Sequence, residues 1–157
     1  MTDSVKKNLQ DAGLSKEYAG GIAAVKYEHR AKIRVKDTRC LQGSLDIDKA
    51  CQKSEPGAFR WDYLVVVKKS NSLNLALIEV HGAAKSSEVD VVIKKKEWIL
   101  QWLGKTKLDE FKKNLFWLST GSVRITAPSK YARRLALSGI PFPRNTTPLL
   151  DTEVEYK

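Results

Sequence analysis

Long apolar runs are absent from this sequence of 157 residues. The longest strongly apolar run is Tyr63 to Val67, whereas a helix that crosses a bilayer needs about 20 apolar residues. The first residues, Met1 to Gln10, are polar and lack the apolar stretch of a secretory signal. We therefore expect a cytoplasmic protein with no membrane partner.

Cysteine is scarce as well. The two cysteines, Cys40 and Cys51, do not have the spacing of a zinc site, and no second pair accompanies them. A disulfide between them would suit an exported protein better than the one expected here. We therefore expect reduced thiols with a structural role.

Several enzyme signatures are missing too. The chain contains no Walker-type phosphate loop, no dinucleotide fingerprint, no metalloprotease helix and no nucleophile elbow. Apolar residues make up 42% of the chain, which supports a packed core and argues against disorder. The length fits one domain, which we place at residues 1–140, followed by an extended tail over 141–157.

Acidic residues are outnumbered, since 28 Lys and Arg face 18 Asp and Glu and leave a net charge of +10. This balance favours a polyanionic partner, usually nucleic acid. No basic tail exists, so folding must assemble any basic surface; the alternative is that the lysines and arginines only solvate exposed faces. The candidate nucleic-acid contacts are Arg30, Lys32, Arg34, Lys94, Lys95, Lys130, Arg133 and Arg134.

Hydrophobic periodicity in the first part of the chain predicts a short helix up to residue 10 and a longer one over 16–29. Alternating apolar and basic residues over 31–35 predict a strand with a basic outer face, with continued helix as the rival interpretation. Residues 37–60 combine turn sequences with one short helix, for which Ser44 is the expected cap.

The second part begins with a continuous apolar segment, typical of a strand buried on both faces. Segments 61–67 and 75–81 read as a β-hairpin, and a long amphipathic helix follows from Ser86 or Ser87 to Gly104. Further predictions are a short helix over 108–114, short strands over 115–119 and 123–125, and a last helix over 130–138. This order fits an α/β fold with a central mixed β-sheet flanked by helices.

Chemistry concentrates at one end of the predicted hairpin. Asp62 begins its first strand and Glu79 lies near the end of the second, so the reversal of the chain brings them together. His81 follows Glu79 by two residues and points to the same face of a strand. Two carboxylates and an imidazole can bind Mg²⁺ or Mn²⁺. The carbonyl of Val80 could add a ligand, and Glu28 could reach this end as a further ligand or base.

Asp62, a short hairpin, the segment 79–81 and the amphipathic helix after it resemble the PD-(D/E)xK nuclease superfamily. The similarity covers roughly residues 16–138 and implies a restriction-endonuclease-like core of a helix, three strands, a helix and a further strand. By this resemblance, Asp62 and Glu79 would be metal ligands. His81 would take the place of the motif's Lys, which positions or activates the attacking water.

The sequence departs from the family pattern at two places. Trp61 precedes Asp62 where the motif has Pro, and His81 replaces Lys. A neutral imidazole can act as a base or a ligand near pH 7, but it lacks the fixed positive charge of Lys. The following helix offers four lysines that could restore this charge, namely Lys85, Lys94, Lys95 and Lys96.

Two functions therefore follow from the sequence. The first is a metal-dependent nuclease with Asp62, Glu79 and His81 as its catalytic set. The second is a catalytically inactive nuclease-like domain that binds nucleic acid or a protein partner. Structural roles for the same residues are the alternative to both: a turn cap, half of an ion pair and a hydrogen-bonded His. Small nucleases of this type commonly dimerise, so the resemblance also implies a homodimer as one arrangement.

Overall fold

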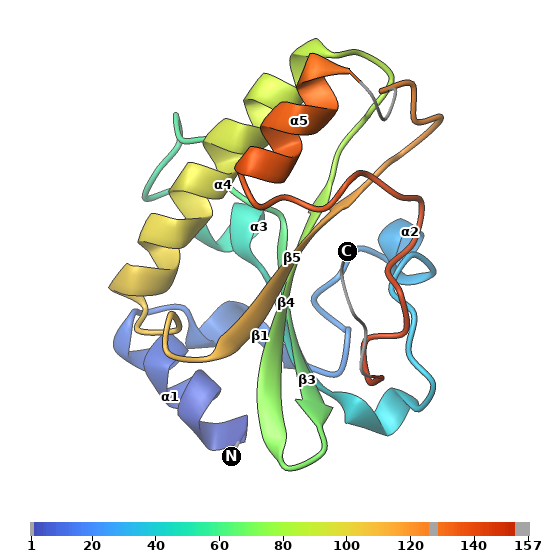
Figure 1. The fold of residues 1–157 in the computed structure, drawn as a ribbon. Helices are drawn as coiled ribbons and strands as arrows, with labels where there is room; N and C mark the ends of the chain where they lie inside the picture. Colours follow the sequence, from blue (N-terminus) through green and yellow to red (C-terminus); the bar gives the residue numbers. More distant parts are fainter. Residues whose placement is uncertain (1, 126–128, 153–157) are drawn as a thin grey trace.

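A computed structural model describes residues 2–125 and 129–152 of the chain. It contains a five-stranded sheet in the order β1-β2-β3-β4-β5, with helices on both faces (Figure 1). The β4–β5 pair is parallel and the other neighbouring pairs are antiparallel. The predicted α/β class, a mixed sheet flanked by helices, is confirmed.

The strands are β1 (Tyr18–Gly20), β2 (Leu41–Asp46), β3 (Tyr63–Lys69), β4 (Ser72–Val80) and β5 (Lys112–Leu118). The helices are α1 (Thr2–Asp11), α2 (Tyr27–Arg30), α3 (Ile47–Cys51), α4 (Ser87–Lys105) and α5 (Lys130–Leu137), with short 3₁₀ turns η1 (Ser15–Glu17) and η2 (Thr38–Cys40). None of the helices in the described parts of the chain is long and apolar enough to cross a membrane.

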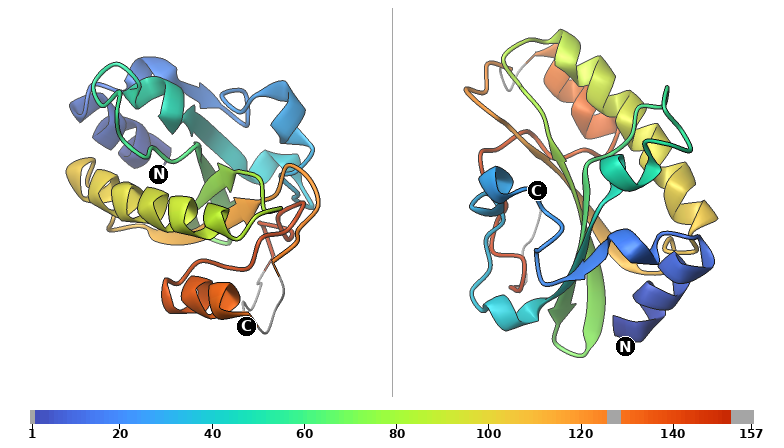
Figure 2. Two further views of the ribbon diagram at one scale, coloured as in Figure 1. Left: turned by 90° about the horizontal axis from the view of Figure 1, so that it is seen from above. Right: turned by 180° about the vertical axis from the view of Figure 1, so that it is seen from behind.

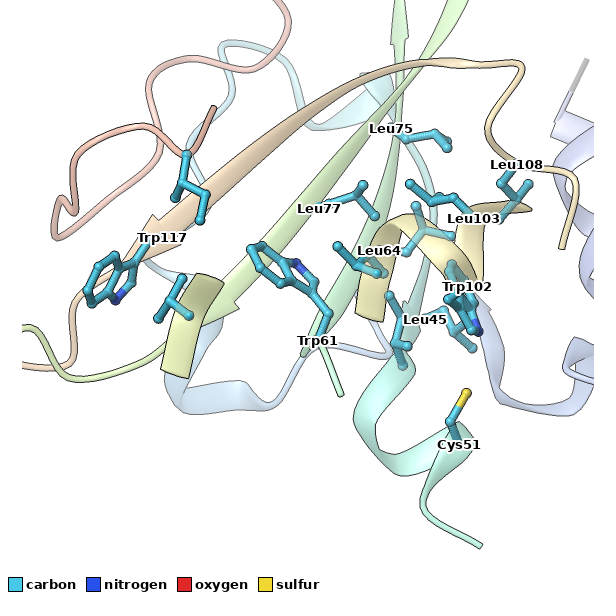
Figure 3. Packing of buried hydrophobic residues seen from close by; sticks show 14 of the residues in the cluster. Leu45, Cys51, Trp61, Leu64, Leu75, Leu77, Trp102, Leu103, Leu108 and Trp117 are labelled. Carbon is cyan, nitrogen blue, oxygen red and sulfur yellow. The ribbon is translucent and has the colours of Figure 1, made fainter. Parts of the chain in front are cut away.

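The sheet separates two hydrophobic cores. The larger core lies on the face covered by α1, α3, α4 and α5, where Leu64 and Leu77 of the sheet meet Leu103 of α4 (Figure 3). The smaller core, which includes Tyr63 and Ile78, lies on the opposite face, toward α2 and the C-terminal segment (Figure 2). Each fully buried Leu or Ile contributes roughly 1.5–3 kcal/mol relative to an exposed one, so both faces stabilise the hairpin at the centre of the sheet.

The β3–β4 hairpin and α4 were predicted and are confirmed. Tyr63 pairs with Ile78 across the hairpin, and the side chains of β3 alternate between the two cores because successive residues of a strand point to opposite faces. In α4, Val92, Ile99 and Leu103 are buried at helical spacing. Glu88 and Lys95 bond to His81 and Glu79, so the N-terminal half of α4 lies over the end of β4.

The N-terminal predictions were partly wrong. Residues 16–29 form η1, β1 and the short α2 instead of one helix. Gly21 has a positive φ of 56°, a left-handed conformation that interrupts a helix and that glycine adopts without strain. The predicted strand over 31–35 does not form: the carbonyl of Lys32 accepts a hydrogen bond from the N–H of Thr147, and the N–H of Arg34 donates to the hydroxyl of Thr147.

Residues 41–46 form β2, where a turn was expected. Ser44 lies in this strand and accepts a hydrogen bond from the N–H of Ala24, while Asp46 caps α3 by accepting from the N–H of Lys49. Gly43 is needed in β2 because a Cβ atom there would lie 2.0 Å from the hydroxyl oxygen of Tyr18. The ring of Tyr18, from the neighbouring strand β1, lies against this backbone.

The remaining differences lie near β5. The helix expected over 108–114 does not form, because β5 begins at Lys112, and residues 123–125 are not a strand. The described part of the tail, up to residue 152, is irregular chain packed on the sheet, with Leu150 buried in the smaller core. Residues 153–157 lie outside the described part of the chain. Helix α5 follows the prediction, with the Ser129 hydroxyl capping it.

Both cysteines of the described chain are free thiols. Cys51, the last residue of α3, is buried in the larger core, and Cys40, the last residue of η2, is half-buried immediately before β2. Burial raises the pKa of the Cys40 thiol to about 11, which keeps the thiol protonated at neutral pH. The expected reduced, structural role is in agreement with these positions.

Candidate metal-binding and catalytic site

The hairpin brings Asp62 and Glu79 to the same end of the sheet. Asp62 lies immediately before β3, and its Oδ2 accepts a hydrogen bond of 2.9 Å from the N–H of Val80 at the end of β4. Glu79 lies one residue earlier on β4, on the same face as Leu77, which faces α4. The two carboxyl groups are thus neighbours, as the hairpin argument predicted.

Glu79 is a fully buried carboxyl group with half of its hydrogen-bonding capacity unused. Its side chain has no exposed surface, and its Oε2 accepts a 2.5 Å hydrogen bond from Lys95 Nζ of α4. Its Oε1 is buried and has no hydrogen-bond partner within residues 2–125 and 129–152. The N–H of Asp62 favours the ionised form of Glu79 from nearby but does not reach hydrogen-bonding geometry. Because unpaired buried polar atoms are costly, a further hydrogen-bond or ligand partner for this oxygen would stabilise the arrangement.

Burial dominates the electrostatics of both acids. It raises the pKa of Glu79 to about 8, the negative charge of Asp62 adds to that rise, and the Lys95 ammonium opposes it. Burial likewise raises the pKa of Asp62, again against the influence of Lys95. One lysine therefore does not offset the desolvation of two acids, and an added cation would stabilise their ionised forms.

His81 belongs to the same end of the sheet but is held by a different partner. Its Nε2 is hydrogen-bonded to Glu88 Oε2 in the first turn of α4, whereas its Nδ1 lies 3.7 Å from Glu79 Oε2. Its backbone is fixed too, since its carbonyl accepts a hydrogen bond of 2.9 Å from Trp117 Nε1. Lys95, not His81, therefore makes the direct hydrogen bond to Glu79.

The structure does not bring Glu28 into this group. Glu28 is exposed on α2, and the next residue, His29, bonds through Nδ1 to the Tyr63 hydroxyl at 2.7 Å. Tyr63 belongs to the smaller core, so α2 packs across the sheet from Glu79. Throughout the described residues, no group of three or more His, Cys, Asp and Glu side chains is placed to hold a metal ion.

A divalent ion must therefore be tested against two carboxylates, Asp62 and Glu79. Mg²⁺ commonly binds proteins through one or two carboxylates and keeps several waters, so two carboxylates are enough protein ligands for an ion of this kind. The unpartnered Oε1 of Glu79 supplies a free acceptor for it. A closed cage of four protein ligands, typical of structural zinc, is not formed by the described side chains.

Two of the predicted nucleic-acid contacts have structural roles. Arg30, the last residue of α2, donates hydrogen bonds to the carbonyls of Val25 and Ala23 in the segment before that helix. Lys32 Nζ donates to the carbonyls of Ser119 and Asn145 and so links the loop after α2 to the C-terminal segment. Their charges stabilise chain connections on the α2 face.

The other predicted contacts divide between surfaces. Lys95 lies in the acidic site, and Arg134 of α5 forms an ion pair with Asp90 of α4. The exposed remainder consists of Arg34 on the α2 face, Lys94 on α4, and Lys130 and Arg133 on α5. The predicted contacts are therefore spread over separate surfaces of the described chain.

Glu88 and the choice of Lys95 were missed at the sequence level. Both lie on α4, seven residues apart, and two turns of helix place residues at this spacing on one face. That periodicity was visible in the sequence. Which face would pack on the sheet depended on the docking of α4, which is set by Val92 and Ile99.

Comparison with family models, with curated proteins and with solved structures gave no match for this chain.

Proposed function

We propose that this chain is a metal-dependent nuclease-like protein that acts on nucleic acid. The supporting observation is Glu79: a carboxyl group without exposed surface, hydrogen-bonded by Lys95, with one oxygen unpartnered and Asp62 beside it. Such a group destabilises the fold when it ionises, and perturbed acids of this kind concentrate at functional sites. A restriction-endonuclease-like core is part of this proposal.

Within this function, Asp62 and Glu79 hold Mg²⁺ or Mn²⁺. A bound ion of this kind supplies an activated water and neutralises charge on a phosphodiester. Lys95 takes the role that the sequence motif gives to Lys, because its ammonium lies within hydrogen-bonding distance of Glu79. His81, held by Glu88, lines the site without taking that position.

The substrate class follows from charge. A net charge of +10 favours a polyanion, and the exposed Lys94, Lys130 and Arg133 on α4 and α5 are available for phosphate contacts. Phosphate contacts of this type bind without reading sequence. A cytoplasmic location, expected from the sequence, belongs to the same proposal.

Cleavage of single- and double-stranded nucleic acid with Mg²⁺ or Mn²⁺ tests this function. Lys95→Met should lower the cleavage rate ~10²–10⁴-fold, the range typical of a lost proton-transfer group. Lys105→Met is the matched control, since Lys105 is exposed at the other end of the same helix, and should retain most of the rate. Equal rates for the two variants would contradict the role of Lys95, and unchanged cleavage by Asp62→Ala would contradict the site as a whole.

A second function is favoured by the pairing of His81 with Glu88 and by the two-carboxylate site. The domain would then bind nucleic acid, or a protein partner, without cutting. Nucleic-acid binding of this type weakens steeply with salt because phosphate contacts release counterions. Salt-sensitive binding with no nicking in Mg²⁺ or Mn²⁺ would support this function over the first.

A further inference from the structure

Strand β5 is the edge of the sheet, and among the described residues only its C-terminal half is paired on the outer side. Arg144 forms a parallel bridge there with Leu118: its N–H donates to the carbonyl of Trp117, and its carbonyl accepts from the N–H of Ser119. In Figure 1 the chain that follows α5 crosses β5 above the strand's N-terminal half. The first residues of β5 lie outside this cover.

The open half of the edge begins at Lys112 and ends at Leu115. Polar backbone groups of alternate residues point to opposite edges of a strand. Because Trp117 and Ser119 bond outward to Arg144, the N–H and C=O groups of Lys113 and Leu115 also point outward. No backbone or side-chain group of the described chain hydrogen-bonds to them. An unpaired edge of this type is a template for another strand.

A groove of about 370 Å³ lies beside this open edge. Its apolar surface comes from Leu100 of α4, Leu115 of β5 and Pro141. Leu100 is 44% exposed and therefore offers apolar surface to a partner. Lys96 and Lys113 also line the groove, and no carboxylate side chain is among its lining residues.

We propose that the open half of β5 and this groove bind an extended acidic segment of a partner protein, which adds to the sheet as a further strand. Backbone pairing with Lys113 and Leu115 would provide affinity, and one apolar side chain of the segment would enter the groove, as in other cases of strand addition. Carboxylates flanking that side chain would meet Lys96 and Lys113.

Charge distinguishes this occupant from a second copy of the chain. Lysines on an edge strand oppose pairing between like copies, and each copy carries a net charge of +10. The same lysines attract an acidic segment. The apolar floor formed by Leu100 and Leu115 suits an aliphatic side chain better than a phosphate backbone.

The probe is a fluorescein-labelled synthetic peptide of alternating Glu and Leu, about eight residues and so ~25 Å long, titrated with the full chain and read by fluorescence anisotropy. Lys113→Glu should weaken binding at least ~10-fold, the equivalent of 1.4 kcal/mol. Lys53→Glu, an exposed loop position with the same charge change, should weaken it less than ~3-fold. Amide NMR signals of Lys113 and Leu115 should shift on binding.

Backbone pairing is tested without altering the protein. Alternate amides of the bound peptide point to opposite edges of its strand. N-methylation of the amides that face β5 should abolish binding, whereas N-methylation of the amides that face away should leave binding unchanged. Equal effects on both edges, equal losses in Lys113→Glu and Lys53→Glu, or no binding would overturn the proposal. Two further results would overturn the proposal by assigning the edge to another occupant. One is self-association of the chain that changes in Lys113→Glu, and the other is competition by oligonucleotides at the amides of Lys113 and Leu115.

Discussion

Replacing Glu79 with Gln removes a carboxyl group that is wholly buried between β4 and α4 while keeping its shape. Burial raises the pKa of Glu79 in the folded chain to about 8 from an ordinary value of 4.5. Between pH 4.5 and about pH 8, the folded state therefore retains a proton on Glu79 that the unfolded state has released. An acid whose pKa is raised by folding contributes its full stabilisation below the pKa of the unfolded state. This stabilisation declines as the pH rises and is lost once the pH exceeds the pKa of the folded state.

The size of the effect follows from the same two pKa values. Within the interval, the free energy of unfolding of the native chain should fall by about 1.4 kcal/mol for each pH unit through this one group. Over the interval from 4.5 to about 8, the total is roughly 3–5 kcal/mol. Glu79→Gln lacks this dependence, so its stability relative to the native chain should rise with pH and level off above the folded pKa of Glu79.

Urea unfolding from about pH 5 to about pH 9, with a chelator present, measures this difference through the linear dependence of the unfolding free energy on denaturant. The matched control is Glu97→Gln, because Glu97 is exposed on the same helix; its stability should follow the native chain in parallel. A Glu79→Gln difference that stays constant with pH would refute the assignment of a raised pKa, and would remove the electrostatic argument for a partner cation.

Two further expectations concern residues around the same strands. In Lys95→Met the pKa of Glu79 should rise further, since the opposing ammonium is gone. The pH at which the free energy of unfolding levels off should therefore move upward in the same urea series. A downward shift would contradict the ion pair. Gly43→Ala should lower the free energy of unfolding by about 1–3 kcal/mol, because its Cβ would lie 2.0 Å from the Tyr18 hydroxyl. Gly57→Ala, with no atom within 4 Å of its Cβ, should lower it little. Thermal unfolding of the two variants measures the difference.

The predictable parts of this fold were those with local signals. The hairpin followed from a continuous apolar run with a polar turn, α5 from the capping Ser129, and α4 from an apolar stripe. The failures depended on contacts remote in sequence. Ile33 is buried in the smaller core and Val35 packs against it, and this spacing produced an alternation that resembled a strand. Likewise, β5 begins at Lys112 because it pairs with β4, which local propensity could not show.

The candidate site also has parts that the sequence predicted and parts that depended on contacts remote in sequence. The proximity of Asp62 to Glu79 follows from the reversal of the chain in the hairpin, which the sequence indicates. Selecting Lys95 among four lysines required the docked position of α4, because neighbouring lysines differ by about 100° around a helix. Glu28 was placed at this site on the assumption of a long early helix, and the structure puts it on α2 across the sheet.

Calorimetric titration with Mn²⁺ of the native chain, Glu79→Gln and Glu97→Gln tests most directly whether the buried acids form a cation site. The native chain and Glu97→Gln should bind one ion, with heats that vary with the buffer because Glu79 releases a proton on binding. Glu79→Gln should bind at least ~10-fold more weakly. Equal affinity for all three proteins, or no binding to the native chain, would contradict the account.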